Sequence, residues 1–432
     1  MNEKANGKAW IVSADMGYGH QRTAYPLKHL AFKDRVITAN NYPGIPEPDK
    51  KIWEGQYNFY NFISKFHEVP LIGRLAFKIF DAFQKIAPFY PRRSRSKSNT
   101  VLKSIYSLFK KGWGRDLIEK LKKENPNLPF VATFFIPAFM AEFFKYPGDI
   151  FCIVTDTDAA RTWVPLNPSA SRIKYLAPTD RVAERLALYG VKKENIISTG
   201  FPLPMENIGQ NYEVIKEDLR TRILNLDPAG DYRQRYGTLI KKHLGNLAEK
   251  PNHPLTILFA VGGAGAQKKL AASILKGLKQ SIEADKLKII LSAGTRKEVN
   301  VFFIKSIDKL KLSRHLGGNL EIIFTPHLFE FFRQFNQALR RTDILWTKPS
   351  ELSFYAALGL PIIIAPAIGS QEDFNKEWLV KLGAGLPQKN PAYANQWLFD
   401  LLNEGWFAQA SLDGFLEAEK FGVNNIARAI SK

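Results

Sequence analysis

Short apolar runs recur along both halves of the chain, and each is followed by a polar or glycine-rich turn and a stretch with helical periodicity. The runs that we interpret as buried strands span residues 9–14, 130–135, 150–155, 175–177, 196–198, 255–261, 288–292, 320–324, 344–346 and 361–365. Helices are predicted between them, including 22–31, 179–189 and 267–283, and over 393–432. This alternation of strand and helix predicts a parallel, doubly wound sheet in each half.

The length of 432 residues also favours two domains. Each half begins with a strand, a glycine turn and a helix. We therefore predict an N-terminal Rossmann-like domain over residues 1–205 and a C-terminal one over 206–432, with the last helix packing back on the first domain. Two doubly wound α/β domains that face a cleft form the GT-B architecture, which is the fold class we predict.

A polar pattern between residues 343 and 375 marks a candidate ligand site. The stretch reads as strand, polar turn, short helix, buried strand and polar turn. Open α/β sheets bind ligands at such turns, because these lie at the carboxyl ends of the strands. The candidate side chains are Lys348, Pro349, Ser350, Glu351, Gln371, Glu372 and Asn375. A solvated turn is the simpler alternative for Glu372.

Two glycine turns follow predicted strands at the start of each half. The first contains Gly17, Tyr18, Gly19 and His20, and a histidine at this helix start could take a proton from an acceptor hydroxyl. A helix-capping or core histidine is the alternative. The second turn contains Gly262, Gly263 and Gly265. It could bring a diphosphate against backbone N–H groups at the start of a helix, although a plain strand–helix turn would have the same sequence.

Asp156 ends another buried run, where a carboxylate could act as a general base or orient one. Its alternative is a helix cap or loop contact. Asp156 and Asp158 form an Asp-x-Asp pair that could bind a metal, but the histidines are scattered and the glycine turn could stabilise a diphosphate by itself. We therefore expect no metal and no other cofactor.

The net charge of +20 is unevenly distributed. Nine basic residues and no acidic residue lie between Asp81 and Asp116, interleaved with aromatic residues near helical spacing. An insertion over about residues 53–115 could dock on an anionic membrane. Nucleic acid is the rival partner and a solvated basic loop the simplest alternative; the aromatic residues favour the membrane, so we do not expect nucleic acid.

Three features of the sequence bear on the cellular compartment of the protein. The one cysteine, Cys152, lies in an apolar run, which favours a buried thiol and a reducing compartment. The polar start shows no signal peptide. The uncharged run 352–371 is interrupted by glycine and proline, which favours buried sheet over a membrane span. We predict a cytoplasmic protein that is peripheral on the cytoplasmic face of the membrane.

Four blocks of the chain together resemble the monogalactosyldiacylglycerol synthase group and, more distantly, the peptidoglycan N-acetylglucosaminyltransferase. These blocks are residues 13–24, 154–202, 262–265 and 347–375. These families are inverting GT-B enzymes that use UDP-sugars at membrane surfaces. The resemblance implies transfer of a sugar from a nucleotide-sugar, expected to be a UDP-sugar, to a lipid or membrane-associated acceptor.

The resemblance also implies roles for individual residues. His20 and Asp156 match positions of acceptor activation, and Gly262, Gly263 and Gly265 match the donor diphosphate loop. Gly294 and Arg296 match a nucleotide contact, His327 flanks the base, and Gln371 and Glu372 match contacts to the donor sugar. The chain departs from the family at Ser350 and Glu351, which replace a glycine pair, and at Ala356, which replaces the ribose glutamate. Glu351 is our candidate substitute for that carboxylate.

Two other functions stay open at this stage. A non-catalytic GT-B-like protein that binds a sugar nucleotide or glycolipid is motivated by Ala356. A sugar-nucleotide epimerase of the same fold would release nucleotide and an epimerised sugar without an acceptor.

Overall fold

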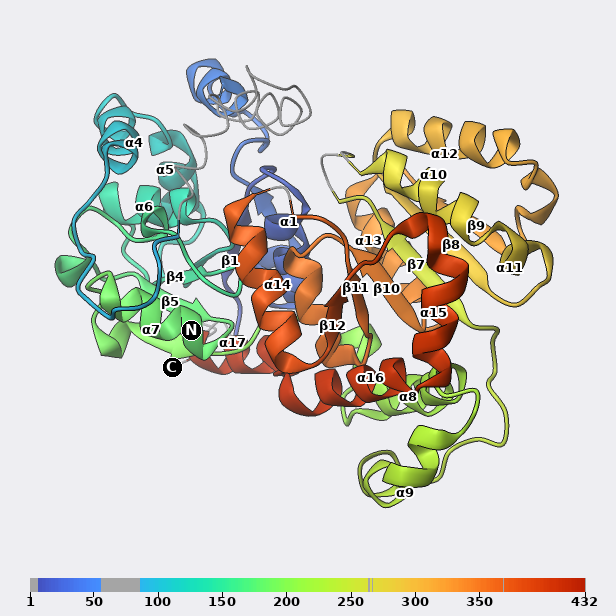
Figure 1. Ribbon diagram of the computed structural model, residues 1–432. Helices are drawn as coiled ribbons and strands as arrows, with labels where there is room; N and C mark the ends of the chain where they lie inside the picture. Colours follow the sequence, from blue (N-terminus) through green and yellow to red (C-terminus); the bar gives the residue numbers. More distant parts are fainter. Residues whose placement is uncertain (1–6, 56–85, 263–264, 266, 368, 432) are drawn as a thin grey trace. The chain divides into compact units, whose positions relative to one another are not determined.

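The structure, a computed structural model, describes residues 7–55, 86–262, 265, 267–367 and 369–431 (Figure 1). The predicted Gly263 and most of the insertion before residue 86 lie outside the described residues. The chain forms two compact units. Unit 1 comprises Met1–Leu203, Ile368–Asn375 and Glu419–Lys432, and unit 2 comprises Pro204–Ala367 and Lys376–Ala418. Unit 1 is thus built from three segments of the chain.

Unit 1 contains a six-stranded parallel sheet with the strand order β2-β1-β3-β4-β5-β6. Its strands are β1 (Trp10–Ser13), β2 (Ile37–Thr38), β3 (Phe130–Ala132), β4 (Ile150–Ile153), β5 (Lys174–Ala177) and β6 (Ile196–Ser198). Five were predicted from their apolar runs. The sixth, β2, has only two residues and no apolar run that would reveal it.

The helices of unit 1 bury a large aromatic core against this sheet. They are α1 (Tyr18–Ala24), α4 (Thr100–Lys110), α5 (Arg115–Glu124), α6 (Phe135–Phe143), α7 (Asp180–Leu188) and α17 (Gly422–Ile430). Phe109 of α4 lies 5.6 Å from Phe143 of α6 and 5.6 Å from Trp113, ring centre to ring centre. Trp113 in turn contacts Trp53 at 4.9 Å. These aromatic residues of the predicted membrane insertion therefore pack inward.

Unit 2 repeats the design with a second six-stranded parallel sheet, in the order β12-β11-β10-β7-β8-β9. Its strands are β7 (Thr256–Ala260), β8 (Lys288–Gly294), β9 (Leu320–Phe324), β10 (Ile344–Thr347), β11 (Ile362–Ile364) and β12 (Gly385–Pro387). Two parallel, helix-flanked sheets confirm the predicted α/β class with two Rossmann-like domains. The three residues of β12 were not predicted.

The helices of unit 2 differ from the prediction in three places. They are α8 (Glu213–Leu226), α9 (Asp231–Leu244), α10 (Lys268–Gly277), α11 (Lys279–Glu283), α12 (Lys297–Lys309), α13 (Leu328–Leu339), η8 (Glu351–Leu358), α14 (Ser370–Leu382), α15 (Ala394–Asn403) and α16 (Trp406–Glu417). The predicted helix 267–283 divides at Leu278. Gly277, just before the division, lies so close to residue 391 that a Cβ on it would be 2.0 Å from the Pro391 carbonyl oxygen. The short helix η8 is a 3₁₀ helix. The second predicted polar turn is wrong, since Ser370 begins α14, with acidic Glu372 and Asp373 in its first turn.

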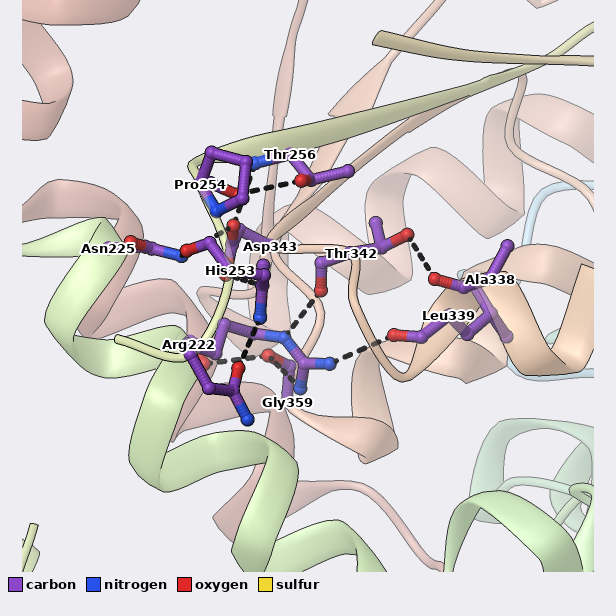
Figure 2. A network of polar contacts seen from close by, with 12 residues as sticks. Arg222, Asn225, His253, Pro254, Thr256, Ala338, Leu339, Thr342, Asp343 and Gly359 are labelled. Atoms are coloured by element: carbon purple, nitrogen blue, oxygen red, sulfur yellow. Dashed lines mark hydrogen bonds and ion pairs between the residues drawn. The ribbon is translucent and has the colours of Figure 1, made fainter. Parts of the chain in front are cut away.

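A buried polar network holds the amino-terminal end of the unit 2 sheet (Figure 2). The guanidinium of Arg222 donates to the carbonyl oxygens of Thr342 and Leu358, at 2.8 Å each. The carboxylate of Asp343, just before β10, accepts from the Thr256 backbone N–H at 2.8 Å and from the Asn225 amide at 3.0 Å. Burial raises the pKa of Asp343, partly offset by His253. The network joins α8 to two strands at the end opposite the predicted ligand edge.

No helix within the described residues is long and apolar enough to cross a bilayer. The uncharged run 352–371 contains most of η8, all of β11 and the start of α14. Its division into short elements was predicted, but α14 begins where a polar turn was expected.

Candidate functional site

The order of strands in unit 1 reverses between β1 and β3. From β1 the chain adds β2 on one side, then returns to add β3, β4, β5 and β6 on the other. The carboxyl ends of strands at such a reversal form the usual ligand crevice of an open α/β sheet. The turn after β1 contains Gly17, whose φ of +119° and ψ of 160° favour glycine, and leads directly into α1. Tyr18, Gly19 and His20 form its first turn.

His20 is oriented across this reversal point. Its Nδ1 lies 2.8 Å from the carbonyl oxygen of Thr133, the residue that follows β3, and 3.5 Å from the Thr155 hydroxyl. A carbonyl oxygen only accepts, so Nδ1 carries the hydrogen, and in the neutral ring Nε2 carries the lone pair. The ring lies against Phe134 at 4.5 Å and Trp163 at 6.1 Å between centres. This is the tautomer that a proton acceptor requires.

Asp156 follows the neighbouring strand β4 and lies one residue after Thr155. Its Oδ1 accepts a hydrogen bond from the amide of Asn375 at 3.0 Å. Asn375 was predicted to bind the donor, and the structure places it in unit 1, fully buried, with its Oδ1 2.9 Å from the Thr157 backbone nitrogen. The second segment of unit 1 therefore contributes directly to the Asp156 turn.

Asp158 has a structural partner. Both of its carboxylate oxygens accept from Arg185, at 2.8 Å and 2.7 Å, and both side chains are buried. The Asp-x-Asp pair is thereby divided, with Asp158 neutralised inside unit 1 and Asp156 half-buried at its sheet edge. Among the described residues there is no group of three or more histidine, cysteine or acidic side chains placed to hold a metal.

Unit 2 has its own reversal point, between β7 and β10. Gly262 follows β7 with φ of +70°, a left-handed conformation that side chains other than glycine rarely adopt. A Cβ there would lie 2.9 Å from Cε of Lys348, which follows β10. The predicted glycine turn and the predicted lysine are thus brought together at the carboxyl edge of the sheet. Pro349, the next residue, is buried.

A second cation lies beside the other end of the glycine turn. A Cβ on Gly265 would lie 3.4 Å from Cδ of Arg296 and 2.8 Å from Val299. Arg296 immediately precedes α12 and lies two residues after Gly294, which ends β8. Its guanidinium also lies 3.4 Å from Glu298. Positive charge therefore flanks the turn at both ends, beside the start of α10, where backbone N–H groups favour an anion.

His327 is exposed and lies immediately before α13, following β9 at the far edge of the same sheet. Its backbone N–H donates to the Thr325 hydroxyl at 3.3 Å. The role of its imidazole beside a base stays a prediction.

Ser350 and Glu351 begin the 3₁₀ helix η8 beside Lys348, and both are half-buried. Ala356 in the same helix is fully buried, and α16 approaches it so closely that a Cβ on Gly414 would lie 2.5 Å from its carbonyl oxygen. A glutamate at 356 would place its charge in the interior of unit 2. Of the two positions, only Glu351 could present a carboxylate at the sheet edge.

Gln371 and Glu372 lie in the first turn of α14, within the segment that belongs to unit 1. Glu372 is only 4% exposed, so the solvated-turn alternative for it is wrong. Sequence reasoning did not single out Thr133, Phe134 or Thr155, which support His20. Their signal is positional, because each follows a buried strand of the same sheet.

The basic segment from Arg92 to Arg115, the first residue of α5, presents its charge outward. Seven of its basic side chains are exposed: Arg92, Arg93, Lys97, Lys103, Lys110, Lys111 and Arg115. Beside them Tyr90 is 65% exposed, and the Arg92 guanidinium lies 5.7 Å from its ring centre. We call this set the basic surface.

Comparison with known proteins agrees with the predicted resemblance. Over 393 residues the chain is 22% identical to the processive diacylglycerol beta-glucosyltransferase of Bacillus mycoides and 23% identical to that of Bacillus cereus, covering 88% of this chain and 82% of each relative. The chain is therefore similar to these two diacylglycerol glucosyltransferases over most of its length. Residues 247–404 also match a family model described as a domain of unknown function, DUF6938.

Two solved structures align over most of the chain. MurG from Acinetobacter baumannii aligns over 98% of this chain and 99% of its own, with 14% identity and a TM-score of 0.46. The UDP-GlcNAc 2-epimerase from Neisseria meningitidis bound to UDP-GlcNAc aligns over 83% of this chain and 86% of its own, with 13% identity and a TM-score of 0.43. The fold assignment rests on the two parallel sheets themselves.

Proposed function

We propose that this protein is an inverting glycosyltransferase that moves a sugar from a UDP-sugar to the hydroxyl group of diacylglycerol or a related membrane lipid. The observation that supports it most is the orientation of His20, because the Thr133 carbonyl fixes the tautomer with a basic Nε2. The similarity to diacylglycerol glucosyltransferases over 88% of this chain supports the choice of acceptor.

Unit 1 would activate the acceptor. His20 Nε2 takes the proton of the acceptor hydroxyl as its oxygen attacks the anomeric carbon of the donor sugar. The carboxylate of Asp156 favours the imidazolium that results. Phe134 and Trp163 pack beside the imidazole and limit its movement.

Unit 2 would bind the donor. As the new bond forms, the bond between the anomeric carbon and the diphosphate oxygen breaks, and its electron pair leaves with the UDP. The N–H groups near Gly262 and Gly265, the start of α10, and the side chains of Lys348 and Arg296 stabilise that charge. These residues provide the electrostatic assistance without a metal ion.

Glu351 would take the place of the ribose carboxylate. A side-chain hydrogen bond to a ribose hydroxyl contributes about 1 kcal/mol, so Glu351→Ala should weaken UDP binding about fivefold. Isothermal titration calorimetry measures the change, with Glu377→Ala on α14 as the control. Equal UDP affinity in wild type and Glu351→Ala would rule out this substitution.

The basic surface would dock the enzyme on anionic lipid. Each lysine or arginine near such a surface contributes about 1 kcal/mol of attraction, which salt screens. Changing Lys103, Lys110 and Lys111 together to glutamate should abolish sedimentation with vesicles that contain phosphatidylglycerol. Binding of the wild type to neutral vesicles with the same strength would contradict the electrostatic explanation.

Transfer itself is tested with purified protein, vesicles containing diacylglycerol, and a panel of UDP-sugars. Formation of a glycolipid together with UDP is the expected result. Release of UDP with an epimerised sugar and no need for diacylglycerol would indicate an epimerase. UDP binding without either product would indicate a binding protein, and no nucleotide binding at all would remove the donor site.

A further inference from the structure

Asn375 lies in the second turn of α14 and is fully buried. It ends the segment Ile368–Asn375, which belongs to unit 1. Its side chain contacts two residues of the turn after β4, Asp156 and Thr157, which precede it by 219 and 218 residues. A residue far away in sequence thus meets the carboxylate that the proposed function uses.

The chemistry of Thr157 fixes which way the amide of Asn375 points. The backbone nitrogen and the hydroxyl of Thr157 both lie 2.9 Å from Asn375 Oδ1. A backbone N–H can only donate, so the atom that faces it is the oxygen. The amide nitrogen therefore faces Asp156, and it donates to Oδ1 at 3.0 Å.

The rest of the turn is held by other contacts. The Thr157 carbonyl oxygen accepts from the Thr179 hydroxyl at 3.0 Å, and Thr179 also caps α7. The next acidic side chain, Asp158, is paired with Arg185. Since these groups fix the backbone on the far side, the bond from Asn375 acts on the orientation of the Asp156 carboxylate.

We propose that Asn375 is a positioning residue that holds the Asp156 carboxylate in the orientation needed for acceptor activation. This inference rests on the proposed function. It replaces the donor contact expected for Asn375, because the two donors of Thr157 already use its amide oxygen. The segment before residue 376 then completes the acceptor half of the chemistry.

The variant Asn375→Asp tests the proposal with an isosteric side chain. It keeps an oxygen for Thr157, but it loses the donor and places a second carboxylate against Asp156. A small misplacement of a catalytic group can cost about 100-fold in rate, so we expect kcat for glycolipid synthesis to fall about 100-fold, with unchanged UDP affinity. A raised KM for the UDP-sugar with wild-type kcat would instead indicate a donor contact and overturn the proposal.

Asn336→Asp is the matched control. Asn336 is 1% exposed, and its amide donates to Glu206 at 2.8 Å within unit 2, away from the site residues. The variant creates the same carboxylate pair and should lower Tm in a similar way while kcat stays at the wild-type value. An equal loss of kcat in both variants would show that Asn375→Asp acts only through stability.

A double variant tests the contact without any turnover. Asn375→Asp alone should lower Tm, and adding Asp156→Asn should restore it, because the exchanged pair again has one donor and one acceptor. The restored protein should still have low kcat, since residue 156 lacks its charge. If the decreases in Tm of the two single variants simply add in the double variant, the two side chains do not interact and the proposal is overturned. If the wild type transfers no sugar, the proposed function fails, and this Tm cycle alone decides whether Asn375 holds Asp156.

Discussion

The two sheets of this protein reverse their strand order at equivalent places, between β1 and β3 in unit 1 and between β10 and β7 in unit 2. The residues at these two places differ in kind. Unit 1 presents an oriented imidazole beside aromatic rings, whereas unit 2 presents glycines between two cations. The same backbone plan thus serves a proton acceptor in one unit and an anion site in the other, because the turn residues decide the chemistry.

The largest effect should come from the imidazole. General base catalysis contributes 100- to 10,000-fold, so His20→Ala should lower kcat for glycolipid synthesis about 1,000-fold. UDP affinity should not change, because the residues proposed to bind the diphosphate and the ribose lie on unit 2. His29→Ala is the matched control, since its Nδ1 also faces a carbonyl oxygen, that of Pro26 at 3.0 Å. Unchanged turnover in His20→Ala would remove His20 from the mechanism.

The polar network at the opposite end of the unit 2 sheet should affect stability without affecting function. Arg222→Met leaves buried carbonyl oxygens without a donor, so the free energy of unfolding should fall by about 3 kcal/mol. Urea denaturation measures this change, and calorimetry on the folded variant should show wild-type UDP affinity. Arg220→Met is the control on the same helix, because Arg220 makes one bond, to the Leu244 carbonyl oxygen at 2.6 Å. A larger loss of unfolding free energy in Arg220→Met than in Arg222→Met would contradict the stabilising role of Arg222.

A side chain added to the glycine turn at Gly262 should weaken UDP binding. Gly262→Ala forces a side chain into a left-handed conformation and against Lys348. With a conformational cost of about 1–2 kcal/mol, we expect UDP affinity to fall about tenfold. Gly317→Ala has the same kind of backbone, with φ of +83°, but nothing within 4 Å of the added Cβ. Equal UDP affinity in the two variants would mean that the turn does not contact the diphosphate.

The smallest effect concerns acid stability in unit 2. Hydrogen bonds from Arg341 and from Lys288 lower the pKa of Glu321 to about 2, from 4.5. A lowered folded-state pKa stabilises the protein above pH 4.5, and this contribution disappears as the pH falls from 4.5 towards 2. Both partners are partly solvated, which weakens the ion pairs. We therefore expect the free energy of unfolding of the wild type to exceed that of Glu321→Gln by only about 1 kcal/mol at pH 7.

Denaturation at several pH values checks this sign. The difference between wild type and Glu321→Gln should close near pH 2. Glu283→Gln, which removes a looser pair with Lys279 at 3.7 Å, serves as the control. A difference that grows as the pH falls would contradict the lowered pKa.

Most of the fold could be predicted because strands that are buried on both faces of a sheet have continuous apolar sequences. Every predicted strand exists in the structure, and β6 and β9 have the predicted bounds. The two strands that were missed, β2 and β12, contain two and three residues and lie at the sheet edges. So little burial leaves no apolar pattern to detect.

The site was less predictable, because its decisive contacts join distant residues. The bond from His20 to Thr133 spans 113 residues, and the bond from Asn375 to Asp156 spans 219. The aromatic residues near the basic surface show the reverse difficulty. Their helical spacing indicates an apolar face, but spacing alone does not tell a core from a membrane, and Phe109 and Trp113 belong to the core.

The three-segment composition of unit 1 has a consequence for synthesis in the cell. The last segment is held in place by Asn425, which donates to the Thr199 carbonyl oxygen at 2.8 Å, and by α17, which contacts the 3₁₀ helix Tyr25–Leu30. A ribosome releases the sheet of unit 1 long before it makes these residues. While all of unit 2 is translated, the first part of unit 1 therefore lacks the contacts that α17 makes with it. Premature termination between Ala418 and α17 would leave unit 2 complete and unit 1 unfinished.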